Sequence, residues 1–65
     1  MPVITIDGPV LALEMKEKLA KELTKLTSEV TNISEDAFVV LFHEHPYESM
    51  AQGGILISEK MKRQK

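Results

Sequence analysis

Apolar and polar positions along the chain follow the spacing of a strand first and of a helix afterwards. The segment 3–6 is short and rich in β-branched side chains, which predicts a strand. Asp7-Gly8-Pro9 follows it and predicts a turn. From about Val10, apolar residues recur every three or four positions with charged residues between them, which predicts an amphipathic helix. Its apolar positions are Leu11, Met15, Leu19, Leu23, Leu26 and Val30.

A second apolar run, residues 38–42, predicts a second strand, and its lack of alternation indicates a strand covered on both faces. Strand, helix and strand in this order form a βαβ unit with parallel strands and a right-handed crossover. Further along, Gln52-Gly53-Gly54 predicts a tight turn, and residues 55–57 predict a short closing strand or hairpin arm. The expected fold class is α/β, a βαβ unit plus a C-terminal β-hairpin, in a single domain over residues 1–65.

The size of the chain indicates self-association. Its 65 residues include no cysteine, and a chain this short buries only about 60% of its unfolded surface, so an isolated monomer is marginally stable. One helix covers only one face of the sheet. The other face therefore needs a second subunit, and we expect a homo-oligomer.

Composition narrows the class of partner. The net charge is −2, which argues against nucleic acid as a partner, although a small basic C-terminus exists. We interpret that C-terminus as a solvated tail or as the favourable end of a final turn; it contains Lys60, Lys62, Arg63 and Lys65. The sequence has neither a long apolar run nor a leader, so we expect a cytoplasmic protein without a membrane partner. We also expect no cofactor and no metal, since two histidines are too few for a four-ligand zinc site.

Pro2 directly follows the initiator methionine. Removal of Met1 would make this proline a terminal secondary amine, whose ordinary pKa is about 8 and falls among apolar neighbours, giving a general base near neutral pH. With Met1 attached, the Pro2 nitrogen is an amide and has no such capacity. The alternative interpretation is structural, because proline before a strand fixes φ and removes a backbone donor.

Four segments carry a resemblance to a known family: Met1-Pro2-Val3-Ile4, Lys16-Glu17-Lys18-Leu19, Val40-Leu41-Phe42-His43-Glu44 and Gln52-Gly53-Gly54-Ile55-Leu56. In order and spacing, over nearly the whole chain, they resemble the 4-oxalocrotonate tautomerase family. The resemblance implies an isomerase that interconverts enol and keto forms of a small conjugated acid, with Pro2 moving the proton. It further implies a homohexamer, a trimer of dimers, whose pockets are each built by more than one chain.

The chain departs from the family at the substrate-binding positions. Studied members hold a dicarboxylate with one arginine before the helix and another on the second strand, and they place an aromatic residue before the Gly-Gly turn. Matching puts Leu11, Val39 and Met50 near these three positions. None is a cation, and the only arginine is Arg63. Because an arginine fork is the natural clamp for a carboxylate, we expect a smaller, less charged or more apolar enolisable acid as substrate.

Other polar residues have more than one interpretation. His43 and His45 share one face if the strand continues, which suits a structural or interface role, a general acid, a substrate contact or a metal. Glu44 is expected to fix a backbone or subunit contact. Tyr47 suits an interface, or a hydrogen bond to a developing enolate.

Because the two arginines are missing, a catalytically inactive oligomeric binding or structural protein on the same scaffold is the alternative function.

Overall fold

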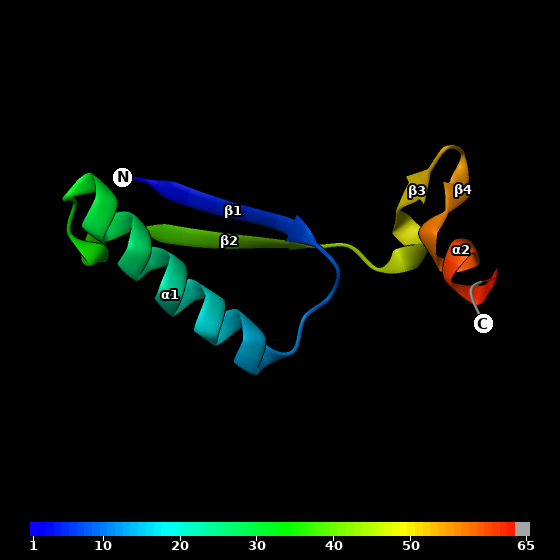
Figure 1. The fold of residues 1–65 in the computed structure, drawn as a ribbon, viewed down its shortest axis with the longest axis horizontal. Coiled ribbons are helices and arrows are strands. Elements are labelled where there is room, and N and C mark those ends of the chain that lie inside the picture. The colour runs from blue at the N-terminus through cyan, green and yellow to red at the C-terminus, as the bar shows by residue number, and fades with distance from the viewer. Residues whose placement is uncertain (64–65) are drawn as a thin grey trace.

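The computed structural model describes residues 1–63, which form two helices and four strands (Figure 1). In chain order they are β1 (Val3–Gly8), α1 (Leu13–Thr31), β2 (Val39–Glu44), β3 (Ala51–Gln52), β4 (Ile55–Leu56) and α2 (Ile57–Arg63). Short 3-10 turns occupy Glu35–Ala37 and Tyr47–Ser49. Lys65, the last residue of the expected basic C-terminus, lies outside the described residues.

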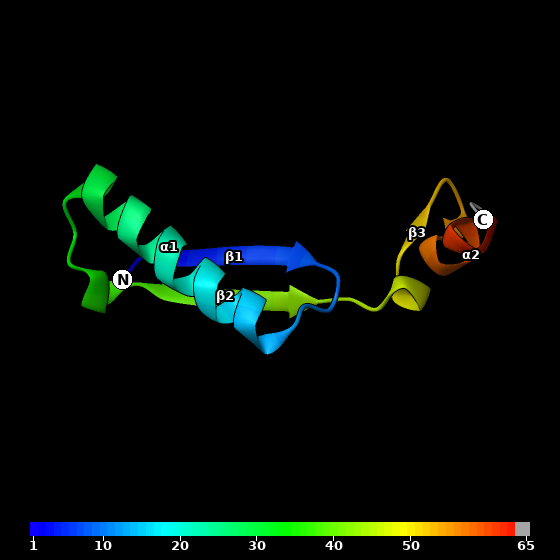
Figure 2. The same cartoon turned by 60° about the horizontal axis from the view of Figure 1, so that its bottom comes forward.

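Strands β1 and β2 pair in parallel, with α1 running across one face of the pair (Figure 2). The register aligns Val3 with Val39 at one end and Gly8 with Glu44 at the other. Strands β3 and β4 form a separate antiparallel hairpin. The predicted fold class, a βαβ unit with parallel strands and a C-terminal hairpin, is therefore confirmed.

Helix α1 starts later than its periodicity suggested. Ala12 has extended backbone angles (φ −64°, ψ 151°), so the helix begins at Leu13 and not at about Val10. At the other end Asn32 takes a left-handed conformation, φ 63°, and its N–H donates to the carbonyl of Ser28 at 2.8 Å. This is a common way to end a helix, and asparagine tolerates the conformation well.

Side chains of the sheet alternate between the two faces. In β1 the side chains of Ile4 and Ile6 are half-buried, whereas Val3 and Thr5 are exposed. β2 alternates from Val40 onward, and its Leu41 is 44% exposed. Within the single chain α1 covers one face of the pair, as expected. The cover of the other face of β2 by a second subunit stays a prediction.

Helix α2 corrects the expectation of a closing strand over residues 55–57. The strand ends at Leu56, and Ile57 already belongs to the helix. The Ile57 N–H donates to the Met50 carbonyl at 2.7 Å, which closes the hairpin back on itself. Glu59 in the first turn and basic residues in the last turn complement the helix dipole and favour this helix; the basic residues are Lys60, Lys62 and Arg63.

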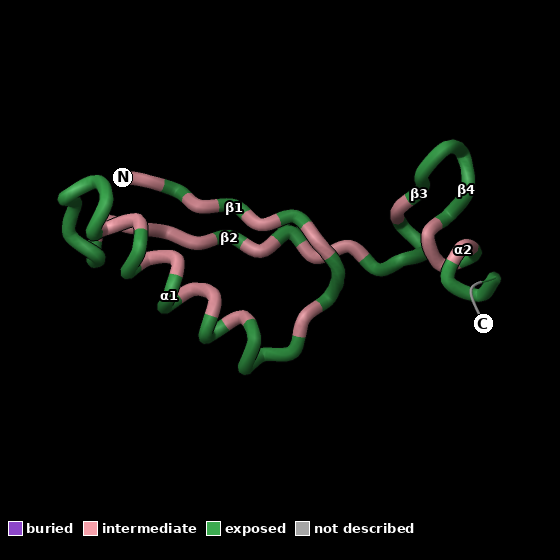
Figure 3. The backbone as a smooth tube through the Cα atoms, in the orientation of Figure 1, coloured by how far each residue is buried: buried purple, intermediate pink, exposed green. Residues whose placement is uncertain are grey.

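The described part of the chain has no buried core of its own. No residue from 1 to 63 is buried, as the tube in Figure 3 shows by colour. The radius of gyration is 15.6 Å, against about 11 Å for a compact domain of this length. The C-terminal arm, residues 47–63, extends away from the βαβ unit and adds to this length (Figure 1). Burial of the apolar surface therefore requires further protein.

Candidate active site

Pro2 lies at the head of β1, directly beside the first residue of β2. Its carbonyl accepts a hydrogen bond of 3.0 Å from the Val39 N–H, and Val39 pairs with Val3 in the parallel register. Both Pro2 and Val39 are half-buried. Two of the four sequence-predicted site residues are therefore neighbours within one chain.

The other two site residues lie elsewhere. Leu11 follows β1, a strand of six residues that is about 20 Å long at the usual rise, so it is found at the opposite end of the sheet from Pro2. Met50 directly precedes β3 in the C-terminal arm, which extends away from the βαβ unit (Figure 1). A single chain does not bring these four residues together.

The side chain of Glu44, the last residue of β2, contacts the start of α1. One carboxylate oxygen accepts a hydrogen bond of 2.8 Å from the Leu11 N–H, and the other pairs with the Lys16 ammonium at 3.1 Å. The side chains of Glu44 and Lys16 are each 27% exposed. The expectation that Glu44 fixes a backbone contact is confirmed.

These partners favour the charged form of Glu44. The Leu11 N–H first, and then the Lys16 ammonium, hold the pKa of the Glu44 carboxyl below its usual value, while partial desolvation opposes them. Glu44 therefore remains a carboxylate at neutral pH and keeps both contacts. Lys16 lies in the first turn of α1, which the packing of the βαβ unit brings to the end of β2.

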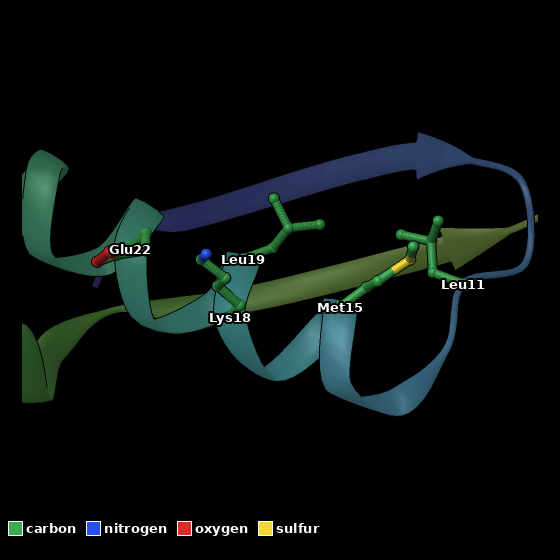
Figure 4. A pocket seen from close by; sticks show the side chains of 5 residues that line it. All are labelled: Leu11, Met15, Lys18, Leu19 and Glu22. Atoms are coloured by element: carbon green, nitrogen blue, oxygen red, sulfur yellow. The ribbon is translucent and has the colours of Figure 1, made fainter.

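An apolar pocket of about 410 Å³ lies against the first turns of α1. It is lined by Leu11, Met15, Lys18, Leu19 and Glu22. Figure 4 shows Leu11, from the loop, and Met15, from the helix, pointing toward one another. Periodicity alone marked these positions as the apolar face of a helix. Because the sheet takes only part of that face, the rest is left to form the pocket.

His43, His45 and Asp7 cluster at the carboxyl ends of β1 and β2. The Asp7 carboxylate lies 3.1 Å from His45 Nε2 and 3.4 Å from His43 Nδ1. The hydrogen bond with His45 is the main cause that lowers the pKa of Asp7. Both histidines therefore approach the same carboxylate, although β2 ends at Glu44, one residue before His45. Asp7, which was predicted as a turn residue, belongs to β1.

Three further features of the described residues bear on function. No group of three or more histidine, cysteine, aspartate or glutamate side chains within residues 1–63 has a geometry that suits a metal ion. No helix in that part of the chain combines the length and apolar character needed to cross a bilayer. Tyr47 is 41% exposed, in the turn that opens the C-terminal arm.

Comparison with known proteins identifies the family. The sequence profile of the family described as "Tautomerase enzyme" matches residues 2–60, which is nearly all of the chain. The chain belongs to the tautomerase family. This membership supports tautomerase-type activity in general, and it agrees with the resemblance carried by the four sequence segments. No curated protein matches the chain.

Several solved structures share the fold. DmpI from Archaeoglobus fulgidus is 33% identical with a TM-score of 0.78, and the match covers 88% of this chain and 98% of that one. A 4-oxalocrotonate tautomerase homologue is 25% identical with a TM-score of 0.83, over 91% of this chain and 95% of that one. A heterohexamer 4-oxalocrotonate tautomerase from Chloroflexus aurantiacus is 19% identical with a TM-score of 0.75, over the same shares, and shows the fold alone.

Proposed function

We propose that this protein is a tautomerase-type isomerase whose general base is the Pro2 amine, set free by removal of Met1. The position of Pro2 carries the proposal: it is half-buried at the head of β1, beside Val39, in a chain whose match to the tautomerase family begins at that residue. A small second residue favours removal of the initiator. The apolar neighbours Val3 and Val39 disfavour the ammonium form and keep a fraction of the amine neutral near pH 7.

The proposed reaction moves one proton within the substrate. In ketonisation the Pro2 nitrogen accepts the proton of the enol hydroxyl, and the same proton or its equivalent is delivered to the carbon at the other end of the double bond. The carbonyl forms as the carbon–carbon double bond is lost, so no electron leaves the substrate and no co-reactant is consumed. A base with a pKa near the working pH suits both halves of this transfer.

The proposed substrate is a small enolisable acid with an apolar group. Leu11, Val39 and Met50 carry no charge at the positions where the resemblance places substrate contacts. An uncharged wall disfavours a second carboxylate, because desolvating it without a partner costs free energy. An arylpyruvate enol, which has one carboxylate and one ring, fits this description.

The proposed active unit is an oligomer, and a homohexamer is the expected form. Within one chain Leu11 lies about 20 Å from Pro2 along β1, so a pocket that holds both needs more than one subunit. The absence of any buried residue within 1–63 and the separate C-terminal arm support this assembly. The heterohexamer from Chloroflexus aurantiacus is a relative of the same fold in which six subunits assemble.

The deciding experiment measures intact mass and turnover on the same native sample. We expect a mass that lacks one methionine, ketonisation of the enol of phenylpyruvate, and loss of that activity in Pro2→Ala with the oligomer intact by sedimentation. Full activity in Pro2→Ala, or turnover by protein that retains Met1, would overturn Pro2 as the base. An inactive protein without Met1 that still binds phenylpyruvate would support the binding-protein alternative.

A further inference from the structure

The segment that contains Leu11 has few ties to the rest of the chain. Among the described residues, two hydrogen bonds from outside reach segment 9–12: Glu44 accepts from the Leu11 N–H at 2.8 Å, and the Ala12 carbonyl accepts from the Lys16 N–H at 3.2 Å. The second bond belongs to the start of α1 itself. Of these two hydrogen bonds, only the one to Glu44 joins Leu11 to the sheet.

Leu11 is also the loop residue among the five that line the apolar pocket, the other four being on α1. Helical residues keep their spacing through the backbone hydrogen bonds of the helix. Leu11 lies outside the helix, so its distance from the pocket residues on α1 depends on the contacts that hold the loop in place. Displacement of Leu11 by an ångström or more would change the pocket's width without changing its chemistry.

From this arrangement we propose that Glu44 is a positioning residue that holds Leu11 against the pocket and so sets its selectivity for a bulky apolar group. The inference rests on the proposed function, since it takes the pocket to receive the apolar part of the enolisable acid. Glu44 is itself the last residue of β2, and a pleated strand fixes the direction of its side chain. Lys16, on the other oxygen, restrains the carboxylate in the orientation that receives the Leu11 N–H.

A pair of substrates separates positioning from general structure. The enol of phenylpyruvate carries a ring, and the enol of pyruvate has the same reacting atoms without it. For Glu44→Ala we expect kcat/KM to fall about tenfold for the phenylpyruvate enol, mainly through KM, because small changes in a shaped apolar pocket have effects of this order. The pyruvate enol should change by less than about threefold, because it has no ring to place.

Matched variants identify which contact matters. Glu44→Gln keeps an acceptor for the Leu11 N–H and should retain most of the selectivity, whereas Glu44→Ala loses it. Glu17→Gln removes an exposed carboxylate one residue after Lys16. It should leave unchanged the ratio of kcat/KM for the phenylpyruvate enol to kcat/KM for the pyruvate enol. Equal losses for both enols in Glu44→Ala, or loss of the ratio in Glu17→Gln, would overturn the positioning role.

A binding measurement separates this inference from the proposed isomerase activity. Phenylpyruvate is titrated into the protein while the Leu11 and Met15 methyl signals are followed by NMR. If the protein turns over neither enol but binds phenylpyruvate at these methyls, and Glu44→Ala weakens that binding by a similar factor, the proposed activity fails and the positioning role stands. If phenylpyruvate leaves both methyl signals unmoved, or binds equally well to Glu44→Ala, the positioning role is wrong.

Discussion

The N–H of Val39 donates a hydrogen bond of 3.0 Å to the carbonyl oxygen of Pro2, which makes position 39 the neighbour of the proposed base within its own chain. The side chain at position 39 is therefore part of the environment of Pro2 within the same chain, independently of any residues that other subunits contribute. In this protein it is an apolar, β-branched residue. The consequence for the substrate is open to a direct test.

Val39→Arg should shift preference toward a substrate with two carboxylates. The new guanidinium gives a second carboxylate a charge-assisted partner that valine lacks, so we expect kcat/KM for an enolisable dicarboxylate to rise about tenfold relative to the phenylpyruvate enol. Val39→Met is the control, since it adds length without charge. If both variants change the ratio equally, charge at position 39 does not select the substrate.

The βαβ unit was predictable because its signals are local. The 3.6-residue period of α1 and the β-branched runs of β1 and β2 each determine one element, and their order determines a parallel pair. Helix α2 was not predictable in the same way. Ile55 and Leu56 continue into Ile57 as one apolar run, and a helix of seven residues is too short to display a period.

The candidate site was predictable only as separate residues. Pro2 and Val39 meet because the register of β1 and β2 brings them together, but nothing within the described chain unites them with Leu11 or Met50. The link from Glu44 to Leu11 joins residues 33 positions apart. Such a contact depends on how the crossover packs, and neither spacing nor composition contains that information.

The Gly53-Gly54 turn gives a prediction about stability. Gly54 has φ +83°, where an L side chain is strained, although a Cβ there would meet no other atom within 4 Å. We expect Gly54→Ala to destabilise the protein by about 1–2 kcal/mol in thermal unfolding at a fixed protein concentration. Gly8→Ala is the control: its surroundings are equally open but its φ is not in the left-handed range, so it should lose no stability. Equal effects at both positions would contradict the backbone explanation.

The contacts of Asp7 with His43 and His45 predict a small acid sensitivity. Because the hydrogen bond with His45 holds the pKa of Asp7 below its ordinary 3.8, the carboxylate stabilises the folded protein above that value and loses this contribution as the pH falls through the lowered pKa. Asp7→Asn should therefore lower the unfolding temperature at pH 5 and approach the parent protein at the acid end of the titration.

The size of that effect is limited to a few degrees, because Asp7 is 65% exposed and water and salt screen a surface pair. Added salt should reduce the difference at pH 5. Asp36→Asn, at another exposed carboxylate, serves as the control and should show no comparable change. A difference between Asp7→Asn and the parent that grows toward low pH would contradict the sign of this linkage.

The lack of a core predicts that stability depends on protein concentration. Folded chains that bury their apolar surface only against one another gain stability by mass action, so the unfolding temperature should rise as the protein is concentrated. Leu56, 47% exposed on β4, is part of the uncovered surface of the arm. Leu56→Lys should therefore lower both the unfolding temperature and the mass seen by sedimentation at a fixed concentration.

Ser49→Lys is the matched control for Leu56→Lys, because it introduces the same side chain at an exposed polar position of the same arm. It should leave the sedimenting mass close to that of the parent protein, since it removes no apolar surface. If Ser49→Lys dissociates the protein as strongly as Leu56→Lys does, added charge and not lost apolar contact is responsible. An unfolding temperature that is independent of concentration, with a monomeric mass, would show that the chain is stable alone and that Pro2 and Leu11 never meet through a second subunit.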